Sequence, residues 1–296
     1  MEKTRKGDGF ESTQKVIRNV LEEYKLMAGR ISEHRGIVTG LSTGFYDLDY
    51  KTRGLQKGEL VLLAGRKWMG KLGLALSIVH HVVTKEKVMT AVFSPSITSS
   101  QVIKRLLAIE MTEKEEIIFN APRDYEEYEL LKNSAQKIAE APIYIDDSAC
   151  ITVEDIRKKC MGLKSEGKLG LIVVDYLQLL SSDGDESGWG IRKVVHGLKE
   201  IAKETDCPLL LISELASDGE RIWFKHPELL SIDDTDYTKQ YADLIMLLYA
   251  EQYDQVKSSE NREAEVIIVK NRDGSTGKVR LAIELGGYRF RNLMIS

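Results

Sequence analysis

Short apolar segments alternate with amphipathic ones along most of the chain after residue 58. The apolar segments are typical of buried strands and are predicted at residues 60–64, 88–94, 143–145, 169–175, 208–213 and 244–249. Between them, apolar residues recur at helical spacing and predict helices at residues 71–84, 99–109, 125–140, 153–166 and 191–204. This alternation predicts an α/β fold with a mainly parallel sheet flanked by helices.

The two ends of the chain depart from this alternation. Residues 263–269 and 278–284 are joined through DGSTG and predict a C-terminal antiparallel hairpin. Residues 1–13 are polar and are predicted to be disordered. Residues 14–28 form an amphipathic helix pattern that we expect to end at Gly29. Its apolar stripe either packs on its own domain or docks on a neighbouring subunit.

Composition narrows the function classes only slightly. The chain is 43% hydrophobic and 30% charged, which is ordinary for a soluble protein. It has no run of about 18 apolar residues and no apolar leader, so we expect no membrane partner and a cytoplasmic location. The three cysteines are odd in number and lack metal-ligand spacing, which favours buried reduced thiols. A net charge of −4 neither indicates nor excludes nucleic-acid binding.

The stretch GRKWMGKLG at residues 65–73 directly follows the strand predicted at 60–64. Its spacing from Gly65 to Gly70 and Lys71 is that of a phosphate-binding loop, in which backbone N–H groups and a helix N-terminus surround phosphate oxygens. Leu72 and Gly73 complete the candidate cofactor-binding residues. Glycine-rich turns between a strand and a helix also serve packing, so the loop alone leaves that alternative open.

A second candidate is Asp175, at the end of the apolar stretch LGLIVVDYLQLL. A carboxylate at the carboxyl end of a buried strand is well placed to hold Mg²⁺ or its water shell. The alternative is an aspartate that caps the next turn. Together, this residue and the loop favour a site for ATP or ADP.

The chain resembles the C-terminal, RecA-like motor domain of DnaB-type replicative DNA helicases, from about residue 14 to its end. The resemblance rests on VTGLSTGFYDLDYKTRGLQKGEL, GRKWMGK, APIYIDDS, LGLIVVDYLQLL, LKEIAKETDCPLLLIS, ADLIMLLY and VKNRDGSTGKVRLAI. It implies a RecA-like P-loop NTPase fold, with a linker helix and linker at residues 14–35 and the motor domain at 36–296. From the resemblance we expect this chain to correspond to the motor domain and not to the family's separate N-terminal helical domain.

The resemblance also implies roles for individual residues. Lys71 would contact the nucleotide phosphates, and Asp175 would hold the metal ion. Lys270 and Arg272 would reach the neighbouring subunit's site and stabilise phosphoryl transfer there. The implied partners are other copies in a ring or hexamer, or an active DnaB-type helicase. The alternative is that no neighbouring subunit is involved, in which case Lys270 and Arg272 are solvated charges beside a turn.

Three positions depart from the family at the reaction centre. Leu72 stands where the family has a Thr or Ser that ligates Mg²⁺, and it offers no oxygen. Ser96 stands in place of the catalytic Glu, and a hydroxyl is a poor base near neutral pH. Glu214 stands in place of the Gln that senses the γ-phosphate, and its charge repels that group. These departures predict an impaired ATPase and a metal site that lacks a ligand.

The loops that would line the family's DNA channel are acidic here. The stretch SSDGDESGWG has no basic residue, and acidic residues outnumber basic ones in ASDGERIWFKHPELLSIDDTDYTKQ. Because phosphate neutralisation supplies most non-specific affinity, we expect single-stranded DNA to bind weakly. The alternative is that these loops are simply solvated and face away from any DNA.

Three functions therefore remain open. The favoured one is an ATPase-impaired homologue that acts by assembly or regulation. The second is an active ATP-dependent replicative helicase in which Ser94, Ser96 or Glu110 replaces the missing groups. The third is a nucleotide-binding regulator without turnover.

Overall fold

The computed structural model describes residues 12–32, 38–112, 114, 116–167, 169–180, 189–215, 235–250, 262–284 and 288–293. The chain divides into two compact units, Met1–Thr39 and Gly40–Ser296. Apart from Ser12 and Thr13, the segment predicted to be disordered lies outside the described residues. Over the ranges described, no helix is both long enough and apolar enough to cross a membrane.

The second unit contains a nine-stranded mixed sheet with the strand order β3-β2-β4-β5-β1-β6-β7-β8-β9. The first six strands along the chain pair in parallel, and the last three are antiparallel. This architecture confirms the predicted fold class. The strands are β1 Leu60–Gly65, β2 Met89–Phe93, β3 Ile143–Asp146, β4 Leu169–Val174, β5 Leu209–Glu214, β6 Leu244–Tyr249, β7 Arg262–Asn271, β8 Gly277–Glu284 and β9 Arg289–Asn292.

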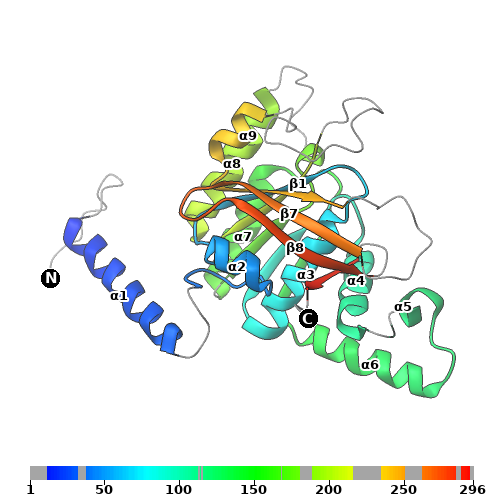
Figure 1. Ribbon diagram of the computed structural model, residues 1–296. Helices are drawn as coiled ribbons and strands as arrows, with labels where there is room; N and C mark the ends of the chain where they lie inside the picture. The colour runs from blue at the N-terminus through cyan, green and yellow to red at the C-terminus, as the bar shows by residue number, and fades with distance from the viewer. Residues whose placement is uncertain are drawn as a thin grey trace. The chain divides into compact units, whose positions relative to one another are not determined.

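Helices cover both faces of the sheet (Figure 1). Alternate residues of β1 point into two separate cores: Val61 and Leu63 pack with α3 and α4, whereas Leu60 and Leu62 pack with α7 and α8. The helices of this unit are α2 Tyr46–Thr52, α3 Lys71–His81 with a π-helical extension Val82–Glu86, α4 Ser99–Met111, α5 Glu116–Asn120, α6 Tyr125–Ala139, α7 Val153–Glu166, α8 Trp189–Thr205 and α9 Thr235–Tyr241, with a 3₁₀ turn at Leu177–Leu179.

The first unit contains helix α1, Thr13–Ser32. The predicted end at Gly29 is therefore wrong, because the helix continues through this glycine. A glycine inside a helix costs only about 1 kcal/mol, which neighbouring helix formers offset. Among the side chains of this stripe that the structure describes, Val16, Val20, Leu21 and Tyr24 are exposed.

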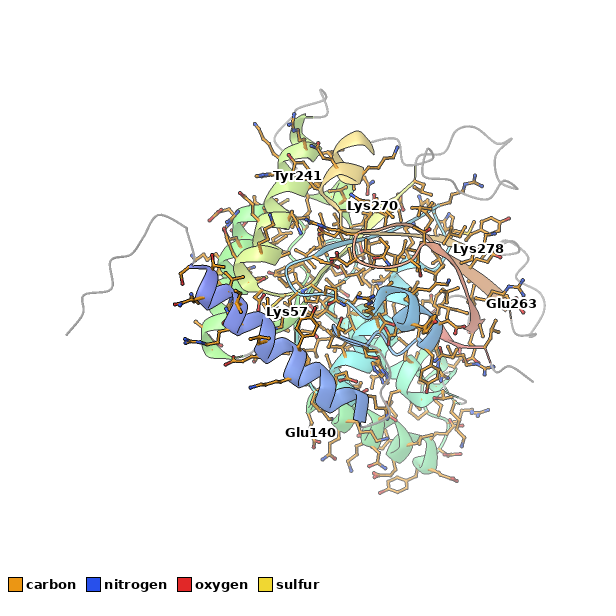
Figure 2. The ribbon with its side chains drawn as sticks, turned by 60° about the vertical axis from the view of Figure 1, so that its left-hand side comes forward. Lys57, Glu140, Tyr241, Glu263, Lys270 and Lys278 are labelled. Atoms are coloured by element: carbon orange, nitrogen blue, oxygen red, sulfur yellow. The ribbon has the colours of Figure 1, made fainter. Side chains whose placement is uncertain are left out.

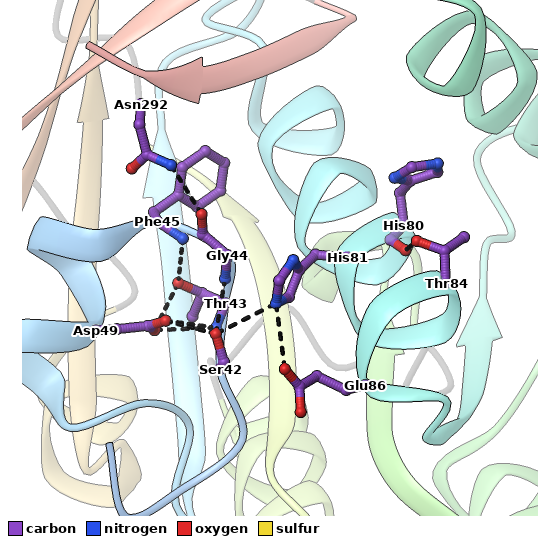
Figure 3. A network of polar contacts seen from close by, with 10 residues as sticks. All are labelled: Ser42, Thr43, Gly44, Phe45, Asp49, His80, His81, Thr84, Glu86 and Asn292. Atoms are coloured by element: carbon purple, nitrogen blue, oxygen red, sulfur yellow. Dashed lines mark hydrogen bonds and ion pairs between the residues drawn. The ribbon is translucent and has the colours of Figure 1, made fainter. Parts of the chain in front are cut away.

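The motif STGFYDLD folds into a buried polar network that joins α2 to the end of α3 (Figure 3). The Asp49 carboxylate accepts hydrogen bonds from Thr43 N at 2.9 Å, Thr43 Oγ1 at 2.7 Å and Ser42 Oγ at 2.7 Å. His81 Nε2 lies 3.3 Å from Ser42 Oγ and 3.6 Å from Glu86 Oε1. This part of the motif thus has a structural role.

Replacing Asp49 with alanine should destabilise the fold by about 2–4 kcal/mol, because it removes the acceptor of the two buried Thr43 donors and of the Ser42 hydroxyl. Chemical denaturation followed by circular dichroism measures this loss. The matched control is Asp47→Ala on the exposed side of α2, which should change the stability by about 0.5 kcal/mol or less. Equal stability of the two variants would contradict the structural role.

Candidate functional site

The loop after β1 has the backbone that its glycines predict. A Cβ on Gly65 would lie 3.0 Å from the Leu248 carbonyl oxygen, so a larger residue would force the strands apart. Gly70 has a φ of +81° and forms the N-cap of α3, which begins at Lys71. The loop therefore ends at a helix N-terminus that points its free N–H groups toward the carboxyl edge of the sheet.

Lys71 lies over this loop rather than in solvent. Its side chain is buried, and Nζ donates a hydrogen bond to the Arg66 carbonyl oxygen at 2.8 Å. Burial lowers the pKa of Lys71 to about 8, although the carboxylates of Glu214 and Asp175 oppose this shift. The ammonium group is thus poorly solvated and ready to accept an anionic partner.

A pocket of about 440 Å³ opens beside Lys71. The structure brings Leu72, Ser96, Asp175 and Glu214 to its wall, although the sequence separates them widely. They meet because the four strands that precede them are neighbours in the order β2-β4-β5-β1, and their carboxyl ends share one edge. The full lining is Lys67, Trp68, Gly70, Lys71, Leu72, Gly73, Ser96, Arg105, Asp175, Tyr176, Ile212, Glu214 and Tyr288.

Asp175 is anchored at the end of β4 and is only 4% exposed. Its backbone N–H donates to the Phe93 carbonyl oxygen at 2.9 Å, and its Oδ2 accepts a hydrogen bond from Ser96 Oγ. Burial raises its pKa, while Ser96, Arg105 and Lys71 favour the charged form. The carboxylate is therefore already partnered within the protein.

Glu214 ends β5, directly opposite Gly65 in the sheet. Its backbone N–H faces Gln178 Oε1 at 3.3 Å, and Gln178 Nε2 donates to Ser213 Oγ at 3.0 Å. The backbone at this position is thus held firmly, with the carboxylate in the pocket wall. Glu214 therefore adds a negative side chain to the wall that also contains Lys71.

Several lining residues, among them Arg105 and Tyr288, were not identified from the sequence. Arg105 comes from α4, which starts with a capping box between Thr98 and Gln101 and therefore follows the Ser96 loop at a defined angle. The Arg105 guanidinium carbon lies 5.0 Å from the ring centroid of Tyr288. The sequence predicted a helix at 99–109, which contains Arg105, but the pattern did not show which face of this helix lines the pocket.

Lys270 and Arg272 lie at the opposite edge of the sheet. Lys270 Nζ donates to the Lys239 carbonyl oxygen in α9 at 2.7 Å. Figure 2 labels Lys270 together with Tyr241, the last residue of α9. Arg272 NH1 pairs with Asp243 Oδ1 at 3.0 Å, and Asp243 N donates to the Leu60 carbonyl oxygen at the start of β1. Since β1 rises about 3.3 Å per residue, this edge is roughly 17 Å from Gly65. These cations do not reach the pocket of their own chain.

Asp243 is the centre of this second cluster. Besides Arg272, it accepts hydrogen bonds from Leu60 N at 2.9 Å and from Lys199 Nζ at 2.5 Å. Burial and the nearby acids Asp243 and Asp273 raise the pKa of Glu59 to about 7. Arg272 is held through one nitrogen, and its side chain is 66% exposed.

The donor set does not fit a resident Mg²⁺ ion. Asp175 and Glu214 both line the pocket, but Leu72 supplies no oxygen at the position where the resemblance implies a second metal ligand. In the part of the chain that the structure describes, no group of three His, Cys, Asp or Glu residues could hold a metal ion. Glu110 does not line the pocket, because it is bonded to His80 and Lys137.

The predicted DNA-facing loops lie largely outside the described residues, which resume at 189 and 235 after their gaps. The expectation of weak single-stranded DNA binding therefore stays a prediction.

Residues 40–292 match the family described as DnaB-like helicase C terminal domain. The chain is 33% identical over 288 residues to the replicative DNA helicase DnaB of Geobacillus stearothermophilus and 32% identical over 280 residues to the replicative DNA helicase DnaC of Bacillus subtilis. These alignments cover 96% and 94% of this chain but 62% of each relative, so the chain spans about three fifths of their length.

Two solved structures resemble this chain over nearly its whole length. The structure titled "ATPase Domain of G40P" aligns with a TM-score of 0.84 and 30% identity, covering 97% of this chain and 100% of that one. The structure titled "The Structure Of A DnaB-Like Replicative Helicase And Its Interactions With Primase" aligns with a TM-score of 0.81 and 29% identity, covering 98% of this chain and 69% of that one.

Proposed function

Because the chain belongs to the DnaB-like helicase C-terminal domain family, we propose that it holds ATP or ADP, hydrolyses ATP poorly, and acts by assembly with other motor domains. One observation carries this proposal. Leu72, Ser96 and Glu214 line the same pocket as Lys71 and Asp175, so the three departures act on one reaction centre.

Each departure removes a different contribution to catalysis. Leu72 removes a metal ligand, and Ser96 removes the carboxylate that would polarise the attacking water. Each loss is expected to cost on the order of two to four powers of ten in rate. A site without both groups turns over near background, whereas the loop backbone and Lys71 still favour phosphate binding.

The proposed assembly has its first support at the far edge of the sheet. Lys270 and Arg272 lie about a strand length from their own pocket, so any nucleotide that they contact would be bound by another chain. Asp243 holds Arg272 while most of the side chain stays exposed. We therefore assign these two residues to a neighbouring subunit's nucleotide, in a ring or hexamer of copies or in a mixed ring with an active DnaB-type helicase.

A second support is the match between α1 and an apolar groove. A pocket of about 330 Å³ lies between α4, α6 and β3, and Ile103, Leu107 and Ile138 are among the residues that line it. The sequence of α1 has more basic than acidic residues, whereas the first turn of α6 carries the exposed Glu126. The neighbouring Asp124 caps the helix, and Glu127 pairs with Arg123. In this proposal residues 14–35 are the linker helix and linker, 36–296 are the motor domain, and α1 docks in this groove of the next copy.

The direct test titrates ATP into the purified protein and then measures phosphate release on the same sample. Saturable binding with release at the background level is expected. Release well above background would overturn the proposal in favour of an active helicase. Absence of binding would remove its nucleotide part.

Placing a charge in the α1 stripe should dissociate the assembly. Leu21→Asp puts a carboxylate into the apolar contact and is expected to weaken association at least about tenfold, since a buried unpaired charge costs several kcal/mol. Sedimentation velocity over a concentration series measures this change. The control Asn19→Asp adds the same charge off the stripe and should leave association within about twofold of the unmodified protein. Identical behaviour of the two variants would exclude α1 as the docking helix.

A further inference from the structure

We propose that the pocket binds a nucleoside diphosphate without a divalent metal ion, with the side chains of Lys71 and Arg105 in place of the metal's charge. This inference rests on the proposed function and specifies the ligand of the same site. It follows from three features of the pocket wall.

The first feature is the apolar side chain at the helix N-terminus. Leu72 lines the pocket and also packs against the large hydrophobic core on that face of the sheet. A magnesium ion here would lose part of its hydration shell against a methyl surface and gain no ligand in return. Because Mg²⁺ dehydrates reluctantly and demands near-octahedral oxygen geometry, this wall disfavours it.

The second feature is that Asp175 already has partners. Ser96 donates to its Oδ2, and Arg105 and Lys71 are close enough to favour its charged form. Ser94 is fully buried and helps to lower the pKa of Asp175, and its Oγ has no hydrogen-bond partner of good geometry among the residues described. A metal ion would have to compete with the Ser96 hydroxyl and with two cations for this carboxylate.

The third feature is the balance of charge around the phosphates. Lys67, Lys71 and Arg105 are the basic residues of the wall, and Asp175 and Glu214 are its acidic ones. This excess of one positive charge attracts a phosphate chain without help from a metal. Glu214 lines the same pocket as Lys71, so its carboxylate would oppose the extra charge of a γ-phosphate held there. Metal-free diphosphate is the form that satisfies both conditions.

The experiment is calorimetric titration of ADP and ATP into the full chain, in Mg²⁺ and in EDTA. The dissociation constant of ADP should agree within about twofold between the two buffers, and ATP should bind about tenfold more weakly than ADP in EDTA. Glu214→Gln should close most of that gap. Leu72→Thr should make ADP binding at least about fivefold tighter in Mg²⁺ than in EDTA, because it restores an oxygen ligand.

The outcomes separate the two levels of the proposal. ADP that binds in Mg²⁺ but not in EDTA overturns the metal-free ligand and leaves nucleotide binding intact. If that dependence disappears in Ser96→Ala, the Ser96 hydroxyl is itself the replacement ligand. No binding of either nucleotide in either buffer overturns the proposed nucleotide function as well. Equal affinity for ADP and ATP in EDTA overturns the assignment of Glu214.

Discussion

Replacing Lys71 with alanine is expected to weaken ADP binding about a hundredfold at pH 7. The ammonium group would donate charge-assisted hydrogen bonds to phosphate oxygens in a poorly solvated site, and such bonds contribute about 1.5–3 kcal/mol each. In this variant the remaining charged residues of the pocket wall are two basic and two acidic ones, so the wall no longer has an excess of positive charge. Titration calorimetry measures the loss, and the fluorescence of Trp68 at the pocket wall gives a second readout.

The matched control is Lys67→Ala. Lys67 lines the same pocket, but its Nζ lies 5.4 Å from the centre of the exposed Trp68 ring, at the mouth of the site. Exposed charges are screened, so this variant should lose less than about fivefold in affinity. Wild-type affinity in Lys71→Ala would contradict the phosphate-binding role of the loop.

The affinity for ADP should also depend on pH and should fall as the pH rises above 8. The pKa of Lys71 in the free protein is lowered to about 8, and a bound phosphate would raise it. Below pH 8 the free and bound states are both protonated, so affinity is constant. Above pH 8 binding must take up a proton, and affinity should fall about tenfold by pH 9. Lys71→Ala should remove this fall.

The sequence is sufficient to predict the elements that have strong local patterns. The strand at 244–249 and the helix at 153–166 match β6 and α7 residue for residue. The apolar runs predicted at 60–64 and 169–175 differ from β1 and β4 by one residue at one end. Short elements such as α2, α5 and β9 were missed because a few residues give too little periodicity to identify.

The site was only partly predictable because its geometry depends on strand order. Gly65, Gly70 and Lys71 belong to one local motif, so their spacing was enough to identify a candidate loop. Ser96 and Asp175 are 79 residues apart and touch only because β2 and β4 are neighbours. The spacing of residues along the sequence does not reveal which strands are neighbours in the sheet.

The far edge of the sheet shows the same limit. The pairing of Arg272 with Asp243, and of Asp243 with Leu60 across 183 residues, depends on β6 lying between β1 and β7. Local sequence therefore identifies the charged residues but not the partners that orient them.

Restoring the three substituted groups together should produce ATP hydrolysis. We expect the variant Leu72→Thr, Ser96→Glu, Glu214→Gln to release phosphate at least about a hundredfold faster than the unmodified chain in the presence of Mg²⁺. The threonine supplies a metal ligand, the glutamate supplies a base, and the glutamine removes a charge that repels the γ-phosphate. Each acts on the same pocket, because all three positions lie in its wall.

The order in which the groups are restored matters for a physical reason. Ser96 is bonded to Asp175, so a glutamate at this position brings two carboxylates together in a buried site. Without a cation between them, one would take up a proton and lose its value as a base. Ser96→Glu alone should therefore stay near background and should gain activity only with Leu72→Thr, which brings in the metal.

A coupled assay of steady-state phosphate release measures these rates. The quadruple variant, which adds Lys71→Ala to the other three substitutions, is the control for contaminating ATPases. That control must remain at background for any gain to count. If the triple variant binds ATP and Mg²⁺ but releases phosphate no faster than the unmodified chain, the three departures are not what limits hydrolysis. The cause would then lie outside the pocket wall, and the neighbouring subunit's Lys270 and Arg272 would be the next groups to vary.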